Sequence, residues 1–515
     1  MEAALEKKYA SFHGTLTAMR SRYALWLFIA AVLGLNVYRA YHQAITHDEA
    51  VTYRDFVAVP WAKLWSTYYP NHHVLHSILC KVAVSLFGAS PVTLRMPSLL
   101  GGLLLMIATV RIVLYGIRPT SLALLTILLV SLNPFVLDYL SAARGYGLSV
   151  GLLLYAIYLT IRAFDAKNQQ PLRDSAALLA AFSAAANLMS MFPVMGMFAA
   201  LFLDARRHHG TRECLVIAAR TIGVFVLAFG VVCGPPLSHA RNEQFAFGAT
   251  SLQQMAESIL SFTLRYAYGA FDVQGHAMDL SPAWHVASTV AYWGIGLLFL
   301  TGLVFSWHPT AEIKYGNNGG RRVLQVVSMV LVMASALQIG AHLLIGTNYP
   351  ISRASLYIVV LGSILPNVLL SVLLVGMRTW KIPLLTAWCT AGGCVVGVLA
   401  SQITTESYVE WKYAADVTRI LATIKEDSKG QSAPVQVIAT WLLVPSMEFY
   451  RRTRPEPWLA EVAIDGLWRT KGKKLKPLAQ YVIMLPGDYD ALDSWDMRVV
   501  EKEILSGAII AKASK

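Results

Sequence analysis

Two adjacent acidic residues, Asp48 and Glu49, stand in the polar stretch AITHDEAVTYRDF (44–56), directly after the first long apolar run of the chain. A carboxylate can take the proton of an attacking hydroxyl group, and cationic side chains can hold a departing phosphate. Such side chains collect in later polar stretches, where the candidates are His72, His73, Arg95, Arg144 with its neighbour Tyr146, and Arg353. This set suits the transfer of a group from a phosphate to an acceptor hydroxyl.

The elements that must position these residues are membrane helices. The chain has 515 residues, of which 56% are hydrophobic and only 14% are charged. A helix of roughly 20 apolar residues crosses the hydrocarbon core of a bilayer, and about a dozen such runs lie between residues 24 and 401. They begin near Ala24, Val74, Met96, Ser121, Gly147, Ser175, Leu215, Val286, Val323, Ser355 and Pro383, together with a short run from Met191 to Asp204. We expect an all-α polytopic bundle of about 11–13 transmembrane helices.

The net charge of +13 reflects membrane topology. Basic residues are scattered through short loops, as the positive-inside rule requires, so a nucleic-acid partner is not expected. Lys7, Lys8, Arg20 and Arg22 precede the first span, and no signal-peptide cleavage pattern is evident there. The N-terminus is therefore expected in the cytoplasm, and Asp48 is expected on the outer face.

Two polar segments, about 42–72 and 237–284, are too long to be simple turns. The first contains PWAKLWSTYYP and suits the membrane interface. The second contains SLQQMAESILSFTLRYAYGAF, where Leu252, Met255, Ile259, Phe262 and Tyr266 recur at helical spacing. We expect an amphipathic helix there, either a lid or acceptor platform or simply an interfacial helix.

The composition becomes that of a soluble protein after residue 401. AADVTRILATIKED predicts a helix, VQVIATWLLV and QYVIMLPG predict strands, and MRVVEKEILS could form either. We therefore expect a transmembrane domain over 1–401 and a small α/β domain over 402–515. KGKKLK (471–476) is interpreted as a solvated loop, with contact to anionic headgroups as the alternative.

The sequence gives only weak indications of a metal site or a disulfide. All five cysteines lie in or beside apolar runs, so no disulfide framework is expected, and Cys389 and Cys394 fit helix packing. His47, His73 and Glu49, with His72 and His76 nearby, could hold a divalent ion, but their spacing closes no ligand set. Asp48 could instead be a helix cap, Arg95 and Arg144 could anchor helix ends, and Tyr146 could be an interfacial aromatic.

Four motifs in order carry a resemblance to a known family. They are the Asp-Glu pair, the His-rich NHHVLH (71–76), LFGASPVTLRMPSLLGGLL and SLNPFVLDYLSAARGYGLS. Over roughly residues 24–165 this pattern resembles the GT-C fold membrane glycosyltransferases of family 39 type, closest to bacterial relatives of protein O-mannosyltransferases and the lipid A aminoarabinose transferase. ESYVEWKYAADVTRIL, at the start of the tail, resembles such members again.

The resemblance implies roles for several residues. Asp48 matches the loop acid that takes the acceptor's proton while a lipid-linked sugar phosphate is displaced, and Glu49 is its neighbour. Arg353 resembles the late-helix arginine that faces the lipid phosphate. The family often has His-x-Pro-Pro or Lys-Pro-Pro where this chain has NHHVLHS, which leaves the roles of His72 and His73 open. Some relatives bind a divalent ion.

The expected function is transfer of a sugar from a polyprenyl phosphate carrier to a glycan, lipid or protein hydroxyl at the outer, periplasmic face of a bacterial inner membrane. The tail is expected on the same face. No Gly-rich nucleotide loop or Asp-x-Asp motif is evident, which disfavours a nucleotide-sugar donor. The alternatives are a transporter or flippase for lipid-linked sugars, for which no internal repeat is evident, and a non-catalytic assembly subunit.

Overall fold

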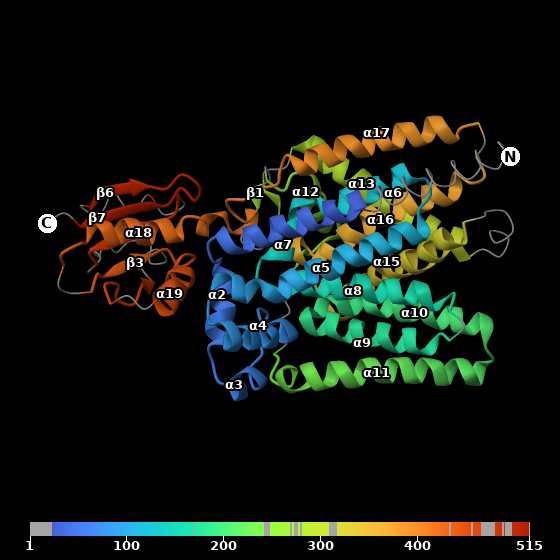
Figure 1. Cartoon of the computed structure of the whole chain (residues 1–515), viewed down its shortest axis with the longest axis horizontal. Coiled ribbons are helices and arrows are strands. Elements are labelled where there is room, and N and C mark those ends of the chain that lie inside the picture. The colour runs from blue at the N-terminus through green and yellow to red at the C-terminus, as the bar shows by residue number, and fades with distance from the viewer. Residues whose placement is uncertain are drawn as a thin grey trace, which may run out of the picture.

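A computed structural model shows a long bundle of helices that continues into a small sheet-containing unit at one end (Figure 1). The fold class is the expected one, a polytopic α-helical bundle followed by a small α/β unit. The structure describes residues 23–166, 168–241, 248–267, 270–271, 277–278, 281–307, 317–377, 379–431, 434–454, 457–464, 479–486, 489 and 497–513.

Nine helices in the described part of the chain are long and apolar enough to cross a membrane, and a bent pair would make ten. The pair is α6 and α7, which meet at 55°. The nine are the helix Tyr23–His42, α5 (Pro91–Gly116), α8 (Gly145–Ala163), α10 (Met191–His208, preceded by η2, Leu188–Ser190), α11 (Thr211–Leu237), α13 (Pro282–Trp307), α15 (Asn318–Ile345), α16 (Leu356–Leu373, preceded by η4, Ser352–Ser355) and α17 (Lys381–Ala400). The bent pair comprises α6 (Thr120–Ser131) and α7 (Pro134–Ser141).

Every expected apolar run forms a helix, but three of these helices are too short for a span: α4, α9 and, unless it is joined to α7, α6. Helix α4 (Val74–Phe87) has 14 residues, and such a helix is only about 21 Å long against a hydrocarbon core of about 30 Å. Helix α9 (Gln170–Ala186) has 17 residues and is rich in Ala and Ser. The short run from Met191, in contrast, lies in a full-length helix. The described residues therefore contain nine helices that could span a membrane, or ten with the bent pair, where the sequence predicts about 11–13 in the whole chain.

Helices α5, α8, α10, α15 and α16 form the interior of the bundle. They bury most of their side chains against one another, whereas α11, α13 and α17 bury few of theirs. Gly147 and Gly151 allow the close packing of α8, because a Cβ atom at Gly151 would lie 2.1 Å from the carbonyl oxygen of Gly101 on α5. An apolar outer surface is expected for helices that face lipid tails.

Short helices cross the end of the bundle that faces the sheet (Figure 1). They are α2 (His47–Thr52), the π-helical turn η1 (Tyr53–Val57) and α3 (Trp61–Trp65). The other long polar segment contains α12 (Leu252–Leu264), which buries Met255 and Phe262 as its amphipathic pattern predicts. Its strands β1 (Ala270–Phe271) and β2 (Ala277–Met278) pair antiparallel.

The C-terminal unit is built on a five-stranded sheet with the order β4-β3-β5-β7-β6. Strands β3, β4 and β5 are parallel, and β7 runs antiparallel to β5 and β6. The strands are β3 (Val437–Ala439), β4 (Ala463–Ile464), β5 (Tyr481–Met484), β6 (Met497–Lys502) and β7 (Ile509–Ala513), with helices α18 (Val417–Asp427) and α19 (Val444–Thr453).

Most of the expected elements of the tail are present. The helix in AADVTRILATIKED and the strand in QYVIMLPG are confirmed, and MRVVEKEILS supplies strand β6. The strand expected over VQVIATWLLV ends at Ala439, because the chain turns there and Val444 begins a helix. KGKKLK lies outside the described residues. All five cysteines lie within them, and none is disulfide-bonded.

The C-terminal unit shares a hydrophobic core with the end of the bundle. Ile45, just before α2, and Ala50, within α2, belong to the same buried cluster as Val437 and Phe449 of the sheet unit. The backbone N–H of Ile45 also donates a hydrogen bond to the hydroxyl of Tyr450 on α19, at 2.9 Å. Packing therefore continues across the change of composition near residue 401, and the sheet unit lies at the same end of the bundle as Asp48.

Candidate active site

The carboxylate of Asp48 lies between two guanidinium groups that come from distant parts of the sequence. Its Oδ2 atom is 3.5 Å from Nη2 of Arg144 and 3.8 Å from Nη1 of Arg353. The Arg144 side chain is buried, whereas those of Arg353 and Asp48 keep 18% and 22% of their surface exposed. The structure therefore brings together three of the residues proposed from the sequence and leaves Asp48 and Arg353 partly accessible.

A second carboxylate completes the group. Oε2 of Glu410 lies 3.5 Å from Nη1 of Arg353 and accepts a hydrogen bond from the hydroxyl of Ser352 at 3.3 Å. Tyr139 donates its hydroxyl to the other oxygen of Glu410. We call Asp48, Arg144, Arg353 and Glu410 the Asp48 cluster. It contains two acids and two permanent cations, so its charges balance when both acids are ionised.

Helix starts place the first two members of the cluster. Asp48 lies in the first turn of α2, and Arg144 is the residue that precedes α8. Arg144 is also oriented by Asn71, whose side-chain oxygen it contacts. The next residue is Gly145, where a Cβ atom would lie 2.1 Å from the carbonyl oxygen of Ala186 and 2.6 Å from the ring of His73. The motif ARGYG thus allows a backbone approach that no larger residue would permit.

Arg353 follows a strained residue. Ser352 adopts φ 47°, a left-handed conformation that is uncommon for residues other than glycine. Its N–H bonds the hydroxyl of Ser258 on α12 at 3.0 Å, and its own hydroxyl bonds Glu410. Two side chains from separate elements therefore hold the turn that aims Arg353, and such strain persists where the surroundings over-determine it.

Glu410 is placed by a buried ion pair. Asp138 on α7 pairs with Arg39 of the first helix and accepts the N–H of Val409 at 2.9 Å. It also accepts the hydroxyl of Tyr266 at 2.8 Å. Because Val409 precedes Glu410 in η5 (Val409–Ala414), this network fixes the segment that carries the second acid of the cluster.

Glu49 and Arg95 form a separate, closed pair. Nε and Nη2 of Arg95 donate to the two Glu49 oxygens at 2.8 and 2.7 Å, and both side chains have no exposed surface. Glu49 also accepts the N–H groups of Thr46 and Ala143. The remaining Arg95 donors bond the carbonyl oxygens of Ala40, Gln43 and Ala44.

All five N–H donors of Arg95 are therefore occupied, and each oxygen of Glu49 accepts two hydrogen bonds. We infer that this pair holds the first helix, α2 and α5 together. The catalytic role expected for Glu49 and the donor-binding role expected for Arg95 stay predictions, and the closed geometry of the pair speaks against them.

The histidines lie around the cluster without forming a metal site. The His73 ring meets Tyr146 edge-on at 4.8 Å, and Tyr146 lies under the guanidinium of Arg144 at 5.8 Å. His72 stacks on Phe56 at 4.0 Å, farther along the same segment. His47 contacts the carbonyl oxygen of Leu442 in the C-terminal unit at 2.9 Å.

Within the described residues, no group of three or more His, Cys, Asp or Glu side chains could hold a metal ion. The residues suggested as metal ligands are thus dispersed. Glu49 is enclosed by Arg95, His47 faces the C-terminal unit, and His73 faces Tyr146.

The two acids of the Asp48 cluster differ in pKa because their surroundings differ. Burial raises the pKa of Asp48, but the charges of Arg144, Arg353 and His47 and a hydrogen bond from Trp411 outweigh it and leave the pKa below its usual value. Burial also raises the pKa of Glu410, and there Arg353 and Tyr139 only partly oppose it. Asp48 is therefore the more firmly ionised acid at neutral pH.

The buried histidines are neutral. Burial lowers the pKa of His72 to about 4, although its bond to the carbonyl oxygen of Thr67 opposes the shift. Burial, followed by the charge of Arg144, holds the pKa of His73 well below its usual value. Neither ring supplies positive charge to a phosphate at neutral pH, so Arg144 and Arg353 are the cations that can do so.

Several members of the site were not among the sequence candidates. Glu410 and Trp411 lie in the tail motif ESYVEWKYAADVTRIL, and Tyr139 and Asp138 lie in SLNPFVLDYLSAARGYGLS. Both motifs carried the resemblance, but nothing in them shows which polar residue faces Asp48. An acid so soon after the last apolar run was the available signal for Glu410, since ionisable residues at helix ends are functional candidates.

An apolar cavity of about 410 Å³ lies beside the segment that carries Arg353. Helices α12, α13, α15 and α16 line it, with Tyr349 and Ile358 on either side of Arg353 in the sequence. Its outer wall includes Trp293 and Leu297, which are 68% and 67% exposed on the surface of the bundle. The cavity therefore reaches the apolar surface of the bundle.

No family model and no curated protein matches the sequence. The structure is similar to that of ArnT from Cupriavidus metallidurans bound to undecaprenyl phosphate, with a TM-score of 0.42 and 13% identity over 97% of this chain and 100% of that chain. It is also similar to the archaeal oligosaccharyltransferase AglB from Archaeoglobus fulgidus, in complex with an inhibitory peptide and a dolichol-phosphate, with a TM-score of 0.43 and 11% identity over 92% of this chain and 71% of that chain.

A third similar structure is the arabinofuranosyltransferase AftD from Mycobacteria, with a TM-score of 0.44 and 13% identity over 96% of this chain. This chain spans only 40% of that protein. At identities of 11–13% and TM-scores of 0.42–0.44, neither an activity nor a residue role passes from these proteins to this chain.

Proposed function

We propose that the chain is an integral-membrane glycosyltransferase that moves a sugar from a polyprenyl phosphate to an acceptor hydroxyl. The observation that carries this proposal is the Asp48 cluster, an accessible carboxylate held between two guanidinium groups at one end of a membrane-type bundle. Such an arrangement can bind a phosphate and accept a proton at the same place.

The proposed reaction exchanges one bond to the sugar for another. The acceptor oxygen attacks the anomeric carbon, the bond from that carbon to the phosphate oxygen breaks, and the polyprenyl phosphate departs. Asp48 takes the proton of the acceptor hydroxyl, and Arg353 and Arg144 bind the charge that develops on the phosphate. Glu410, which accepts a hydrogen bond from Tyr139, holds Arg353 in place.

The resting charge balance explains how Asp48 can become a base. Beside two arginines its pKa is low, so the free carboxylate is a weak base. A bound phosphate shares the guanidinium groups and adds negative charge next to Asp48. Both changes raise the pKa of Asp48 toward the operating pH, where a general base works best.

The apolar cavity supports a lipid-linked donor. It adjoins the Arg353 segment and reaches the apolar outer surface of the bundle at Trp293 and Leu297. An isoprenoid chain could lie there with its phosphate at Arg353 and its tail in the bilayer. A soluble nucleotide sugar would gain nothing from such a lining.

The reaction is proposed to occur on the outer face of a bacterial inner membrane. The basic residues before the first helix favour a cytoplasmic N-terminus, which places α2 and the C-terminal unit in the periplasm. A reporter active only in the periplasm should therefore be active when fused after Lys515 and silent when fused at Gly316. The opposite pattern would place the site on the cytoplasmic face.

Two experiments test the activity itself. Lipid extracts of a deletion strain should accumulate one polyprenyl phosphate-linked sugar, which identifies the donor. Purified protein supplied with that donor should then release polyprenyl phosphate in the presence of the acceptor, and the Asp48→Asn variant should not. If the wild-type protein only moves the intact donor across vesicle membranes, the protein is a transporter and the proposal fails.

A further inference from the structure

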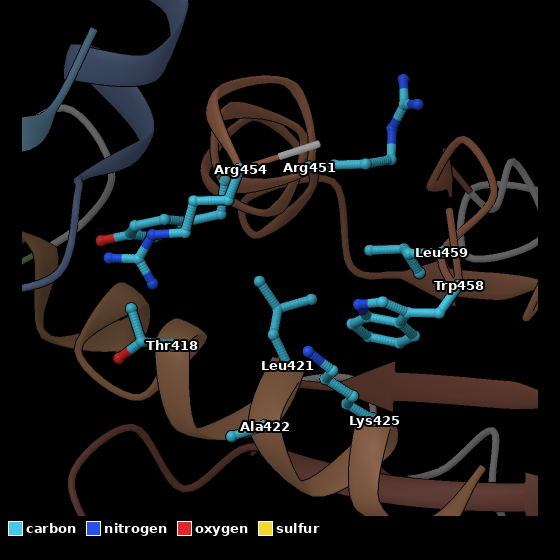
Figure 2. Close-up of a pocket in the computed structure, with 9 residues that line it drawn as sticks. Thr418, Leu421, Ala422, Lys425, Arg451, Arg454, Trp458 and Leu459 are labelled. Carbon is cyan, nitrogen blue, oxygen red and sulfur yellow. The ribbon is translucent and has the colours of Figure 1, made fainter. Parts of the chain in front are cut away.

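A second cavity, of about 240 Å³, lies in the C-terminal unit between α18 and α19 (Figure 2). Its volume is below the range of about 300–1,000 Å³ that is typical of drug-sized ligands. It therefore suits a small unit such as one sugar ring. Its lining consists of Thr418, Leu421, Ala422 and Lys425 from α18, Tyr450 and Arg451 from α19, and Arg454, Trp458 and Leu459 from the segment that follows.

Among the described residues, the lining contains three cations and no acid. Glu448 binds Arg451 with two hydrogen bonds of 2.7 Å, so the charge of Arg451 is already compensated. The guanidinium of Arg454 lies 5.0 Å from the ring centre of Tyr450, and among the described residues no carboxylate pairs with it. Lys425 lies on the other side of Leu421 from Arg454, as Figure 2 shows. An anion in the cavity could thus pair with the guanidinium of Arg454.

An aromatic ring forms one wall of the cavity. Figure 2 shows the indole of Trp458 beside Lys425, with Leu421 between them and Arg454. The segment of Trp458 is tied to the sheet, because its carbonyl oxygen accepts the N–H of Val435 at 2.7 Å. The backbone that carries the ring is therefore held in position before any ligand arrives, which reduces the entropy lost on binding.

From this combination we propose that the cavity binds an anionic monosaccharide unit, one that carries a carboxylate or a phosphate. The face of a sugar ring presents C–H groups that pack on an indole, while its hydroxyls stay solvated. The anionic group would pair with Arg454 through charge-assisted hydrogen bonds. A neutral sugar would use only the aromatic wall, and a free anion would use only the cations.

Tyr450 connects this cavity to the end of the bundle. Its ring lines the cavity, and its hydroxyl accepts the N–H of Ile45, which lies just before the start of α2 at His47. A ligand in the cavity would therefore lie near the residues that precede α2, the helix that carries Asp48. The use of the cavity to anchor an acidic acceptor rests on the proposed function, whereas the binding itself does not.

Full-length purified protein in detergent tests the binding by calorimetry or ligand-observed NMR. The probes are methyl glucuronide for the carboxylate and glucose 6-phosphate for the phosphate, with methyl glucoside and inorganic phosphate as matched controls. At least one anionic sugar should bind, and at least about tenfold more tightly than either control, as the loss of one charge-assisted bond predicts. The comparison of the two anionic sugars identifies the charged group.

Variants place the binding in this cavity. Arg454→Gln and Trp458→Leu should each weaken binding about tenfold or more. Lys429→Gln removes the same charge from an exposed ion pair with Glu426 outside the cavity and should leave affinity unchanged. Thermal unfolding of each variant shows whether it is folded.

Three results would overturn the proposal. They are no binding of either anionic sugar by the wild-type protein, equal affinity for inorganic phosphate, and unchanged affinity in the folded Arg454→Gln variant. Asp48→Asn should bind the probes with wild-type affinity, because Asp48 does not line this cavity. The binding measurement therefore does not depend on whether the protein is a transferase. A loss of binding in Asp48→Asn would instead locate the probe in the Asp48 cluster.

Discussion

Asp48 and Glu49 are neighbours in the sequence, yet the structure places them in opposite situations. Glu49 has no exposed surface and all its acceptor positions face Arg95 or backbone N–H groups. Asp48 contacts two arginines at 3.5 and 3.8 Å and keeps 22% of its side chain exposed. The Glu49 carboxylate uses all its acceptor positions to hold elements together, whereas the longer contacts of Asp48 allow it to exchange partners. The geometry of the ion pairing, rather than the residue type, therefore determines whether an acid has a structural or a chemical role.

The largest expected effect is on turnover in Asp48→Asn. This substitution keeps the side-chain shape and removes the proton acceptor, so the transfer rate should fall about 10²–10⁴-fold, the usual contribution of general base catalysis. The melting temperature should change little, because Asp48 is partly exposed. Turnover with a defined lipid donor and thermal unfolding measure the two effects. Near-normal turnover would remove the distinction between the two acids.

Glu49→Gln should show the reverse pattern. It leaves Arg95 as a buried charge without its counter-ion, which typically costs about 3–5 kcal/mol of stability. A large drop in melting temperature and yield should follow, measured by intrinsic fluorescence during heating. Replacing both partners, as in Glu49→Gln with Arg95→Met, should recover part of the loss. If Glu49→Gln melts normally but is inactive, Glu49 belongs to the catalytic machinery after all.

Substitutions of Arg353 extend the comparison from the acids to the cations of the Asp48 cluster. Loss of a charge-assisted hydrogen bond typically costs about 1.5–3 kcal/mol, so Arg353→Ala should weaken donor binding by roughly 10–100-fold. Arg353→Lys should be milder, since an ammonium keeps the charge but cannot form two parallel bonds with a phosphate. Arg322→Ala, near the start of α15, is the matched control. Equal donor affinity in all three variants would assign Arg353 a structural role.

The smallest expected effect is a shift in pH dependence. A base is active when deprotonated, so activity is lost as pH falls through its pKa. Arg144 helps to hold the pKa of Asp48 below its usual value, and its charge is the largest influence acting in that direction. Arg144→Gln should therefore move the acidic limb of the kcat/KM profile to higher pH. A limb that stays in place, or moves to lower pH, would show that Asp48 is not the titrating base.

The fold could be predicted from the sequence largely because membrane helices are specified locally. Each run of apolar residues must satisfy its own backbone hydrogen bonds in lipid, so composition alone indicates where helices lie. The predicted helix in α18 and the strand in β5 are similarly local. The number of spans was harder, because α4 and α9 differ from true spans by a few residues and by polarity.

The candidate site was only partly predictable. The sequence by itself placed Asp48 after the first span and supplied Arg144 and Arg353 as cations that could face it. The tertiary structure alone decided that Asp48 is open and Glu49 closed. Adjacent helical residues point about 100° apart, so one can face the core while the other stays partly exposed. It also decided that Glu410 joins the site, since Asp138, Arg39 and Tyr266 bring η5 to the end of the bundle. Such contacts join segments far apart in the chain, and no local pattern encodes them.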